Sequence, residues 1–253
     1  MFSPKSRKKI LVPNDSGSSY FEPFRFLGLG YTSDVTSIER YPDDIAMVVF
    51  TGGEDVSPSI YGRQQHPRTY ASMNRDIVEM AVFHKALDLG LPMAGICRGA
   101  QFLCVMAGGK LVQDISGHGQ NHSLTALNPG GNAEVVGVTS THHQMQYPFD
   151  LVPGSQYEVL AWAQTPLSTH YAFDDSTIIL AADATPELRL EPDVVWYPEI
   201  KALGAQFHPE WMADTSPGLQ YYRRLVSHYL VPIMEANEPR TAKSTNKTVK
   251  TAG

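Results

Sequence analysis

Cys97 lies in the pentapeptide Gly-Ile-Cys-Arg-Gly of residues 95–99, between the short apolar run 92–96 and residues 100–107, which can form a helix. A strand, a tight turn and a helix in this order are typical of a nucleophile elbow, here with cysteine in place of serine. Glycine on both sides permits the sharp turn. The N-terminus of the helix would favour the thiolate and offer N–H groups to an oxyanion. The alternative is a buried structural cysteine.

A cysteine hydrolase also needs a base near the sulfur and a third group that orients this base. His208, Pro209 and Glu210 follow residues 203–207, an apolar run that predicts a strand. They would lie at the edge of a sheet where α/β proteins place ligand crevices. With strand-like alternation, His208 and Glu210 project to the same side, so the carboxylate could hold one imidazole nitrogen while the other faces the sulfur. Taken alone, this segment also fits an exposed polar loop.

The oxyanion that forms on nucleophilic attack requires backbone donors. One is the N–H of Arg98, the residue after the candidate nucleophile. The other could come from Gly52 and Gly53, which follow the apolar run 45–50 and whose lack of side chains lets the backbone approach a substrate. An ordinary turn is the alternative interpretation of this glycine pair.

Several histidines raise the question of a metal site with Asp114, namely His118, His122, His142 and His143. The adjacent residues His142 and His143 point to opposite sides of an extended chain, and no pair with H-x-x-x-H spacing lies in a predicted helix. The sequence therefore predicts no metal site and no cofactor.

Composition restricts the class of protein. The chain has 253 residues, of which 42% are hydrophobic and 18% charged, as in globular proteins. It contains no apolar run long enough to span a membrane. The net charge of −6 argues against a nucleic-acid surface. Two cysteines within one predicted strand–helix unit form no disulfide framework, which indicates a cytoplasmic protein. The second, Cys104, is predicted to be a buried core thiol.

Hydrophobic patterning predicts a single α/β domain over residues 9–234, with a mostly parallel central sheet flanked by helices. Residues 1–8 form a basic tail and residues 235–253 a disordered polar tail. Predicted strands cover residues 9–12, 45–50, 133–138, 157–162, 169–173, 178–182 and 194–197, and a short one starts within residues 108–114. Residues 21–29 are predicted as a helix, and residues 117–131 as a loop beside a site.

Two further helices are predicted from caps and apolar stripes. Asn74 would cap a helix that ends before Gly90, with the buried stripe Ile77, Met80, Ala81, His84 and Leu87. Ser216 would cap a second helix with Pro217 at its first position. The apolar stripe of this helix is Leu219, Tyr222, Leu225, Val226 and Tyr229.

The elbow of residues 95–101, the glycine turn 51–55 and residues 208–211 resemble, in identity and order, the motifs of class I glutamine amidotransferases. Four further segments are similar to the γ-glutamyl-γ-aminobutyrate hydrolase branch, also called peptidase C26: residues 55–62, 74–76, 108–114 and 141–144. The resemblance covers roughly residues 45–230. Two departures are Thr-Gly-Gly-Glu-Asp in place of Pro-Gly-Gly-Gly-Asp at residues 51–55, and residues 192–196, where the branch carries a Glu-Ala-Ile-like segment.

The resemblance implies a role for each matching residue. Cys97 would be the nucleophile, His208 the general base and then acid, and Glu210 the carboxylate that orients it. Gly53 and Arg98 would supply the oxyanion hole through their N–H groups. The substrate-binding residues would be Gly52, Gln101, His142, His143 and Gln144. The implied chemistry is hydrolysis of a γ-glutamyl amide through a γ-glutamyl thioester.

Three functions remain open at this point. The chain could alone hydrolyse a small γ-glutamyl amine, or it could be a glutaminase that delivers ammonia to a separate synthase partner. The third is a catalytically inactive binding or regulatory subunit, which would have no chemical need for an intact Cys–His–Glu set. We expect a small-molecule γ-glutamyl substrate or glutamine as the partner, with no nucleic acid and no membrane. A homodimer is an open alternative.

Overall fold

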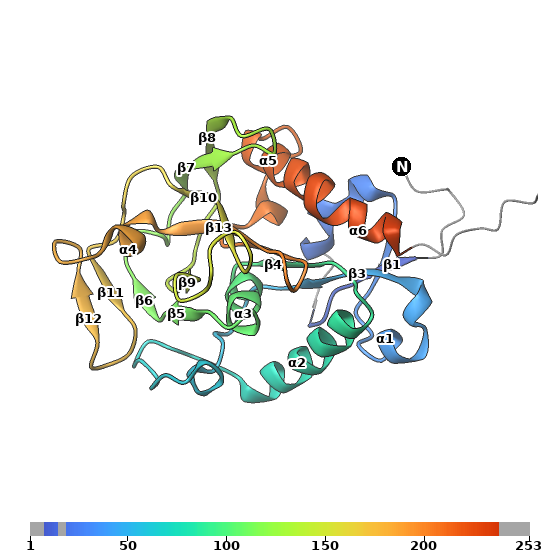
Figure 1. The fold of residues 1–253 in the computed structure, drawn as a ribbon, viewed down its shortest axis with the longest axis horizontal. Coiled ribbons are helices and arrows are strands. Elements are labelled where there is room, and N and C mark those ends of the chain that lie inside the picture. The colour runs from blue at the N-terminus through green and yellow to red at the C-terminus, as the bar shows by residue number, and fades with distance from the viewer. Residues whose placement is uncertain (1–7, 15–18, 238–253) are drawn as a thin grey trace, which may run out of the picture.

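The computed structural model of the protein describes residues 8–14 and 19–237. Within these residues the main sheet has nine strands in the order β2-β1-β3-β4-β14-β13-β10-β7-β8 (Figure 1). The strands are β1 (Lys9–Leu11), β2 (Gly30–Thr32), β3 (Ile45–Phe50), β4 (Met93–Ile96), β7 (His122–Leu127), β8 (Ala133–Val138), β10 (Glu158–Ala163), β13 (Pro192–Tyr197) and β14 (Ala202–Ala205).

The sheet has two halves that meet at β14. From β2 to β14 every pairing is parallel, whereas β13, β10, β7 and β8 continue it with antiparallel pairings. All six residues of β3 are buried, as the continuous apolar run predicts for a strand covered on both faces. The predicted α/β class with a parallel central sheet flanked by helices is confirmed.

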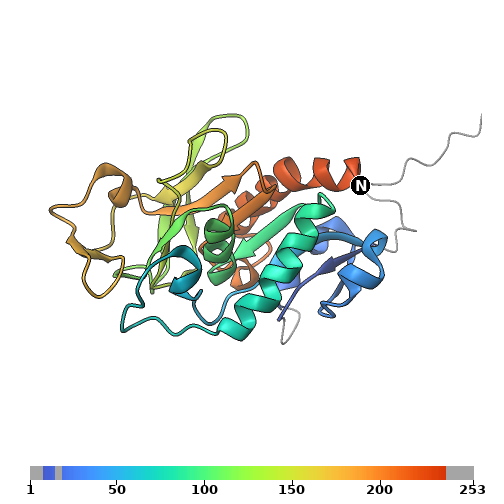
Figure 2. The same cartoon turned by 60° about the horizontal axis from the view of Figure 1, so that its bottom comes forward.

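Helices cover both faces of the parallel half (Figures 1 and 2). On one face lie α2 (Met73–Asp88) and α3 (Arg98–Met106), which pack Phe83, Phe102 and Leu103 against the sheet. On the other face lie α5 (Pro217–Leu225), the π-helical turn η5 (Val226–Leu230) and α6 (Val231–Ala236), with Tyr222 and Leu225 in the core. Ser216 caps α5 through the N–H of Leu219, as predicted.

A smaller β region lies beside the antiparallel half, at the left of Figure 1. It contains a three-stranded sheet of β6 (Asp114–Ile115), β11 (His170–Ala172) and β12 (Ile178–Leu180) among the described residues. The pair β5 (Lys110–Val112) and β9 (Met145–Tyr147) packs nearby. The remaining short elements are α1 (Ser37–Arg40), α4 (Pro186–Leu190), η2 (Pro42–Asp44), η3 (Pro58–Tyr61) and η4 (Pro209–Trp211).

Two predicted elements are wrong in type. Residues 21–29, predicted as a helix, fall in the 3-10 helix η1 (Ser19–Leu27), which contains Pro23 and therefore lacks one backbone donor. The region 117–131, predicted as a loop, contains β7. Only Leu124 and Ala126 of this strand are buried, and the polar His122 begins the same side of the strand while Ser123 and Thr125 lie on the other, so the two-residue apolar period is too short to recognise in the sequence.

The buried face of α2 also differs from the predicted stripe. The buried residues are Asp76, Glu79, Val82, Phe83 and Ala86, whereas Ile77 is 58% exposed. The helix is therefore rotated so that two carboxylates face the interior. Its N-cap position is Ser72 rather than Asn74.

The predicted tails fall mostly outside the described residues. Of the basic tail 1–8, only Lys8 is described. Of the polar tail 235–253, Glu235 and Ala236 belong to α6, so the last helix extends past the predicted end of the domain, and residues 238–253 are not described.

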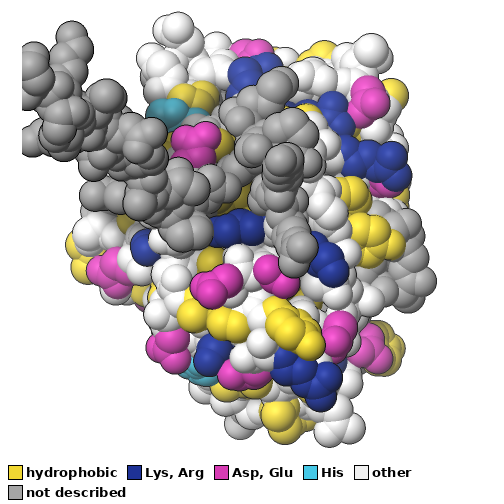
Figure 3. All heavy atoms as spheres, turned by 90° about the vertical axis from the view of Figure 1, so that its right-hand side faces the viewer, with side chains coloured by type: hydrophobic (Ala, Val, Ile, Leu, Met, Phe, Trp, Pro, Cys, Tyr) yellow, Lys and Arg dark blue, Asp and Glu magenta, His cyan; other side chains and the backbone are white. Residues whose placement is uncertain are grey.

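In the part of the chain that the structure describes, no helix is both long enough and apolar enough to cross a lipid bilayer. On the end of the molecule seen in Figure 3, acidic and basic side chains of the described residues lie interspersed among small hydrophobic groups.

Candidate active site

Cys97 forms the turn between β4 and α3 and adopts φ 53° and ψ −109°. This backbone conformation is disfavoured for any residue with a side chain and costs about 1–3 kcal/mol. Hydrogen bonds on both sides hold it, because the Cys97 N–H donates to the carbonyl of Ala205 at 2.8 Å and the N–H of Ala100 donates to the Cys97 carbonyl at 3.0 Å. The local geometry is that of a strained nucleophile elbow, and its sulfur is half-buried.

The two flanking glycines are required by close backbone contacts. A Cβ at Gly95 would overlap the carbonyl of Gly99, and a Cβ at Gly99 would overlap the carbonyl of Phe50 in β3. Both obstacles are backbone atoms, which cannot rotate away as a side chain could. The elbow thus fits against the neighbouring strand only without side chains at these positions.

We therefore expect Gly99→Ala to destabilise the fold by about 3 kcal/mol or more, the upper range for overpacking of a buried site. The matched control is Gly137→Ala in β8, where an added Cβ meets no atom within 4 Å, and we expect a change of at most about 0.5 kcal/mol. Urea unfolding followed by circular dichroism measures both. Equal midpoints for the two variants would contradict this account of the elbow.

His208 lies near Cys97 because β14 pairs in parallel with β4, with Ala205 opposite Ile96. The segment that leaves β14 therefore ends beside Cys97. His208 Nδ1 lies 2.6 Å from Glu210 Oε1, and the Glu210 side chain is fully buried. The sequence predicts strand-like alternation for His208 and Glu210, but the two residues do not lie in a strand, because η4 begins at Pro209. The 3-10 turn instead brings the carboxylate back to the imidazole.

The His208 imidazole has one nitrogen directed by Glu210 and the other left free. Nε2 is buried and has no hydrogen-bond partner among the described residues. Burial lowers the pKa of His208, but the hydrogen bond with Glu210 and the negative charges of Cys97 and Glu210 outweigh it and raise the pKa to about 9. The ring stacks on Trp211 at 3.8 Å between centroids and 4° between planes. The Thr139 hydroxyl donates to the His208 carbonyl at 2.6 Å.

The glycine turn 51–55 lies next to the side chains of Cys97 and His208. A Cβ at Gly52 would lie 3.5 Å from Cys97 Cβ and 3.4 Å from His208 Cε1. Gly53 has φ +124°, a conformation that favours glycine. Arg75 holds this turn, since its Nη2 donates to the carbonyls of Thr51 and Gly52, both at 3.0 Å.

The Arg98 side chain is 1% exposed and forms ion pairs with the two buried carboxylates of α2, Asp76 and Glu79. Glu79 also accepts from Arg75 at 3.0 Å. Burial lowers the pKa of Arg98 to about 9, so the guanidinium remains charged at neutral pH. This buried network joins the elbow helix, α2 and the glycine turn.

A cavity of about 310 Å³ joins these elements. It brings together most of the residues predicted from the sequence: Gly53, Cys97, Arg98, Gln101, His142, His143 and His208. Gln144 does not line it, since its side chain is fully buried and donates to Thr69 Oγ1 at 3.0 Å. The Gln144 carbonyl instead accepts from the Gln101 amide at 3.1 Å and fixes it at the cavity wall. Gly52 and Glu210 lie behind the wall.

Sequence reasoning missed three polar cavity residues, Tyr20, Asp55 and Thr141. Asp55 lies 3.4 Å from His143 Nε2, and this contact is the main cause of the raised pKa of His143. Asp55 belongs to the segment 55–62 that carried the family resemblance, so its place in the sequence was a usable signal. Tyr20 comes from η1, whose sequence contains no motif that points to a site.

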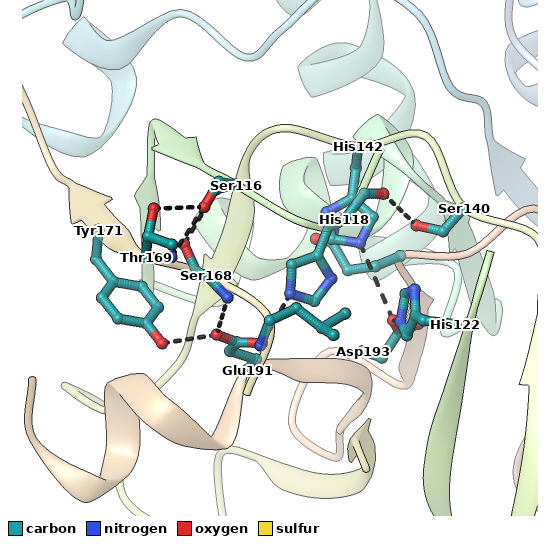
Figure 4. Close-up of polar contacts among 12 residues, drawn as sticks. Ser116, His118, His122, Ser140, His142, Ser168, Thr169, Tyr171, Glu191 and Asp193 are labelled. Carbon is teal, nitrogen blue, oxygen red and sulfur yellow. Dashed lines mark hydrogen bonds and ion pairs between the residues drawn. The ribbon is translucent and has the colours of Figure 1, made fainter. Parts of the chain in front are cut away.

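The histidines that raised the metal question separate into two groups. Asp114 contacts His143 and His170. His118 and His122 instead gather with Asp193 of β13, and one donor atom from each of the three lies within 4.8 Å of the others (Figure 4). Sequence reasoning did not connect Asp193 with these histidines, because it lies far from them in the chain and the segment 192–196 gave no metal motif.

Comparisons with known proteins agree with this geometry. The sequence profile of the peptidase C26 family matches residues 27–210. The γ-glutamyl-γ-aminobutyrate hydrolase PuuD of Escherichia coli is 28% identical over 167 residues, which cover 62% of this chain and 60% of that protein. A Mycobacterium tuberculosis protein provisionally named a glutamine amidotransferase, Rv2859c, is 43% identical over 89 residues, 34% of this chain and 29% of that protein. The chain thus matches less than two thirds of either relative.

A solved structure supports the fold. The crystal structure of a glutamine amidotransferase from Thermotoga maritima superposes with a TM-score of 0.53 at 15% identity, covering 92% of each chain. At this identity the likeness concerns the arrangement of the backbone alone.

Proposed function

Since the chain belongs to the peptidase C26 family, we propose that it is a cysteine-dependent hydrolase of γ-glutamyl amide bonds. The observation that carries the proposal is the convergence, in one cavity, of a strained cysteine elbow and a histidine held by a buried carboxylate. Family membership supports a hydrolase or amidotransferase-type enzyme in general. The bond that is cleaved and the roles of the residues are the proposal.

The proposed reaction begins when the Cys97 sulfur attacks the γ-carbonyl carbon of the substrate and forms the C–S bond. The N–H groups of Arg98 and Gly53 stabilise the negative charge that develops on the carbonyl oxygen. The His208 imidazolium gives its proton from Nε2 to the leaving nitrogen, the C–N bond breaks, and an amine or ammonia departs. The product on the enzyme is a γ-glutamyl thioester.

Water completes the cycle. His208, now neutral, takes a proton from the water as its oxygen attacks the thioester carbon. The C–S bond breaks, glutamate is released, and the sulfur and imidazolium are restored. The 2.6 Å contact between His208 and Glu210 supports both steps, because it keeps the ring oriented while its protonation state changes.

Among the functional alternatives, a stand-alone hydrolase of a small γ-glutamyl amine has the best support. The E. coli relative that aligns with 62% of the chain is named a γ-glutamyl-γ-aminobutyrate hydrolase. The cavity of about 310 Å³ has the size for a small ligand. A glutaminase that supplies ammonia to a synthase partner is the second candidate, supported by the relative named a glutamine amidotransferase.

The two candidates differ in the substrate that the chain turns over alone. We expect glutamate release from one γ-glutamyl amine, γ-glutamyl-γ-aminobutyrate being the first to test, with kcat/KM at least about tenfold above that for L-glutamine, which corresponds to about 1.4 kcal/mol of discrimination. The control is the Cys97→Ala protein with the same substrates. Slow hydrolysis of glutamine alone would favour the ammonia donor and lead to a search for a co-purifying synthase.

A regulatory subunit without activity is tested by thiol labelling. An active site predicts that iodoacetamide labels Cys97 first, because Cys104 is fully buried and burial raises its pKa to about 12. Equal labelling of both cysteines, together with no glutamate release from any substrate, would reject the enzyme proposal.

A further inference from the structure

A cluster of three histidines and one aspartate lies next to the cavity, at the antiparallel part of the sheet (Figure 4). Its members are His118, which precedes β7, and His122, the first residue of β7. His142 comes from the loop before β9, and Asp193 from β13. The side chains of all four are at least 94% buried. Buried polar groups in this number require partners, so their hydrogen bonds are informative.

The outer contacts fix which nitrogen of each ring carries a proton. His118 Nε2 lies 2.9 Å from a Glu191 oxygen, and that carboxylate also accepts from Tyr171 and from the N–H groups of Leu167 and Ser168. A carboxylate that already accepts from three other donors is ionised and can only accept, so His118 Nε2 carries the hydrogen. His142 Nδ1 lies 2.8 Å from the backbone carbonyl of Gln144, and it must donate for the same reason.

The inner nitrogens of both rings are therefore lone pairs. His118 Nδ1 and His142 Nε2 are buried and have no hydrogen-bond partner among the described residues. The two rings lie 4.7 Å apart between centroids. His142 Nε2 points to Asp193 Oδ2, at 4.0 Å (Figure 4). A nitrogen of His118 lies within 4.8 Å of donor atoms of His122 and Asp193, and His142 Nε2 borders this group through Asp193.

His122 and Asp193 close the other side. His122 Nδ1 lies 3.2 Å from the Gln120 carbonyl, which leaves Nε2 turned toward Asp193 Oδ2 at 3.2 Å. Asp193 Oδ1 accepts from the N–H of Phe207, so Oδ2 is the oxygen that faces the histidines. A proton on His122 Nε2 would satisfy this pair, but it would leave the lone pairs of His118 and His142 without any donor.

We propose that this cluster binds a divalent transition-metal ion such as zinc, through His118 Nδ1, His122 Nε2, His142 Nε2 and Asp193 Oδ2. One cation satisfies all four acceptors at once, which no single proton can do. Three imidazoles and a carboxylate are a donor set that zinc accepts in tetrahedral geometry. With the charges of Asp193 and Glu191, a dication gives a neutral buried site.

The surroundings have the features of an outer shell for a metal site. Each histidine donates its second nitrogen to a carboxylate or a backbone carbonyl, which fixes the tautomer and orients the ring. The proposed set has four protein ligands and leaves no position for substrate, which is typical of a structural rather than a catalytic ion. This proposal differs from the expectation from the sequence that the chain holds no metal site.

Such an ion would support the active site indirectly. It would connect β13, the start of β7 and the loop that contains His142, whose ring lines the catalytic cavity. Asp193 also holds the N–H of Phe207, the residue before the catalytic base. The ion would thus fix one wall of the cavity without contact with the reacting atoms.

The test uses the full chain after removal of any affinity tag that contains histidine. The protein is dialysed against a chelator, then titrated with Zn²⁺ or Co²⁺. We expect one equivalent per chain by elemental analysis, visible absorption typical of four-coordinate cobalt, and a melting temperature that rises with added zinc. A folded wild-type chain that takes up no stoichiometric metal, with an ordered water at this point in a crystal structure, would overturn the proposal.

Variants locate the ion. His122→Gln is expected to lower the affinity for zinc more than about 100-fold, beyond the 10–100-fold effect of outer-shell changes. His228→Gln, on the exposed surface of η5, is the matched control and should retain one equivalent. Near-UV circular dichroism establishes that each variant is folded. Equal metal content in the two variants would place any bound ion elsewhere and overturn the assignment.

Discussion

Replacing Cys97 with alanine is expected to lower kcat by about 10⁴–10⁶-fold, the range for removal of a nucleophile from a site whose other groups act with it. The elbow positions only one sulfur at the cavity, and without it the thioester cannot form. The remaining oxyanion donors and the base could at most assist direct attack by water. Because Cys97 is half-buried at a turn that its neighbours hold, the alanine variant should remain folded.

Cys104→Ala is the matched control, since it removes the other thiol of the chain. Cys104 is fully buried in the core on the α3 side of the sheet and does not line the cavity. We expect its kcat to stay within a few-fold of the wild type. The measurement is steady-state glutamate release with the best substrate of the panel. A Cys97→Ala protein that kept more than about a tenth of the wild-type kcat would exclude the covalent mechanism.

Glu210→Gln is expected to lower kcat about 10²–10⁴-fold. The substitution keeps the size of the side chain and exchanges only the charged acceptor for an amide. His208 then loses the contact at 2.6 Å that fixes the proton on Nδ1 and directs Nε2 into the cavity. Glu199→Gln is the control, because Glu199 is exposed on a turn away from the cavity.

The same variant changes the pH profile in a defined direction. In the wild type, burial lowers the pKa of His208, but Cys97 and Glu210 together raise it to about 9. In the proposed reaction the imidazolium donates a proton to the leaving group, so kcat/KM should fall as the pH rises through about 9. Glu210→Gln removes one of the two raising contributions, and the alkaline limb should move to lower pH. An unchanged limb would mean that Glu210 does not control the base.

The raised pKa also links His208 to stability. A group whose pKa is higher in the folded chain than its ordinary value near 6.5 stabilises the fold below that value. This contribution is lost as the pH rises through about 9. Unfolding free energies of the wild type and of Glu210→Gln should therefore converge at alkaline pH.

The candidate site could be located from the sequence, because the chemistry proposed for Cys97, His208 and Glu210 constrains short segments. The elbow needs glycine on both sides of Cys97, and the base needs its carboxylate two residues away, so both signals are local. The resemblance to the peptidase C26 branch rests on four further short segments and is confirmed by the family profile. The buried strand β3 was predicted with its observed bounds, since a run of six apolar residues leaves few alternatives.

The missed features depend on contacts between distant segments. The buried face of α2 was wrongly predicted because Asp76 and Glu79 read as solvent-exposed residues, whereas Arg98 of α3 neutralises them in the interior. The histidine cluster was missed because its carboxylate comes from β13. In both cases a charged residue of another element allows a polar residue to be buried, and no local sequence pattern indicates that contact.

The position of β14 has a consequence for how the protein acquires activity during folding. This strand joins the parallel and antiparallel halves of the sheet, with β4 on one side and β13 on the other. Cys97 follows β4 and His208 follows β14. The two residues therefore meet only when the hairpin of β13 and β14, near the C-terminal end of the chain, pairs with β4, which precedes it by about a hundred residues. A slip of two residues in that pairing would displace the base by about 6.6 Å. Under the proposed mechanism, hydrolysis reports on this single long-range docking step. A chain with every helix and hairpin in place but β14 unpaired from β4 is then expected to have no catalytic activity.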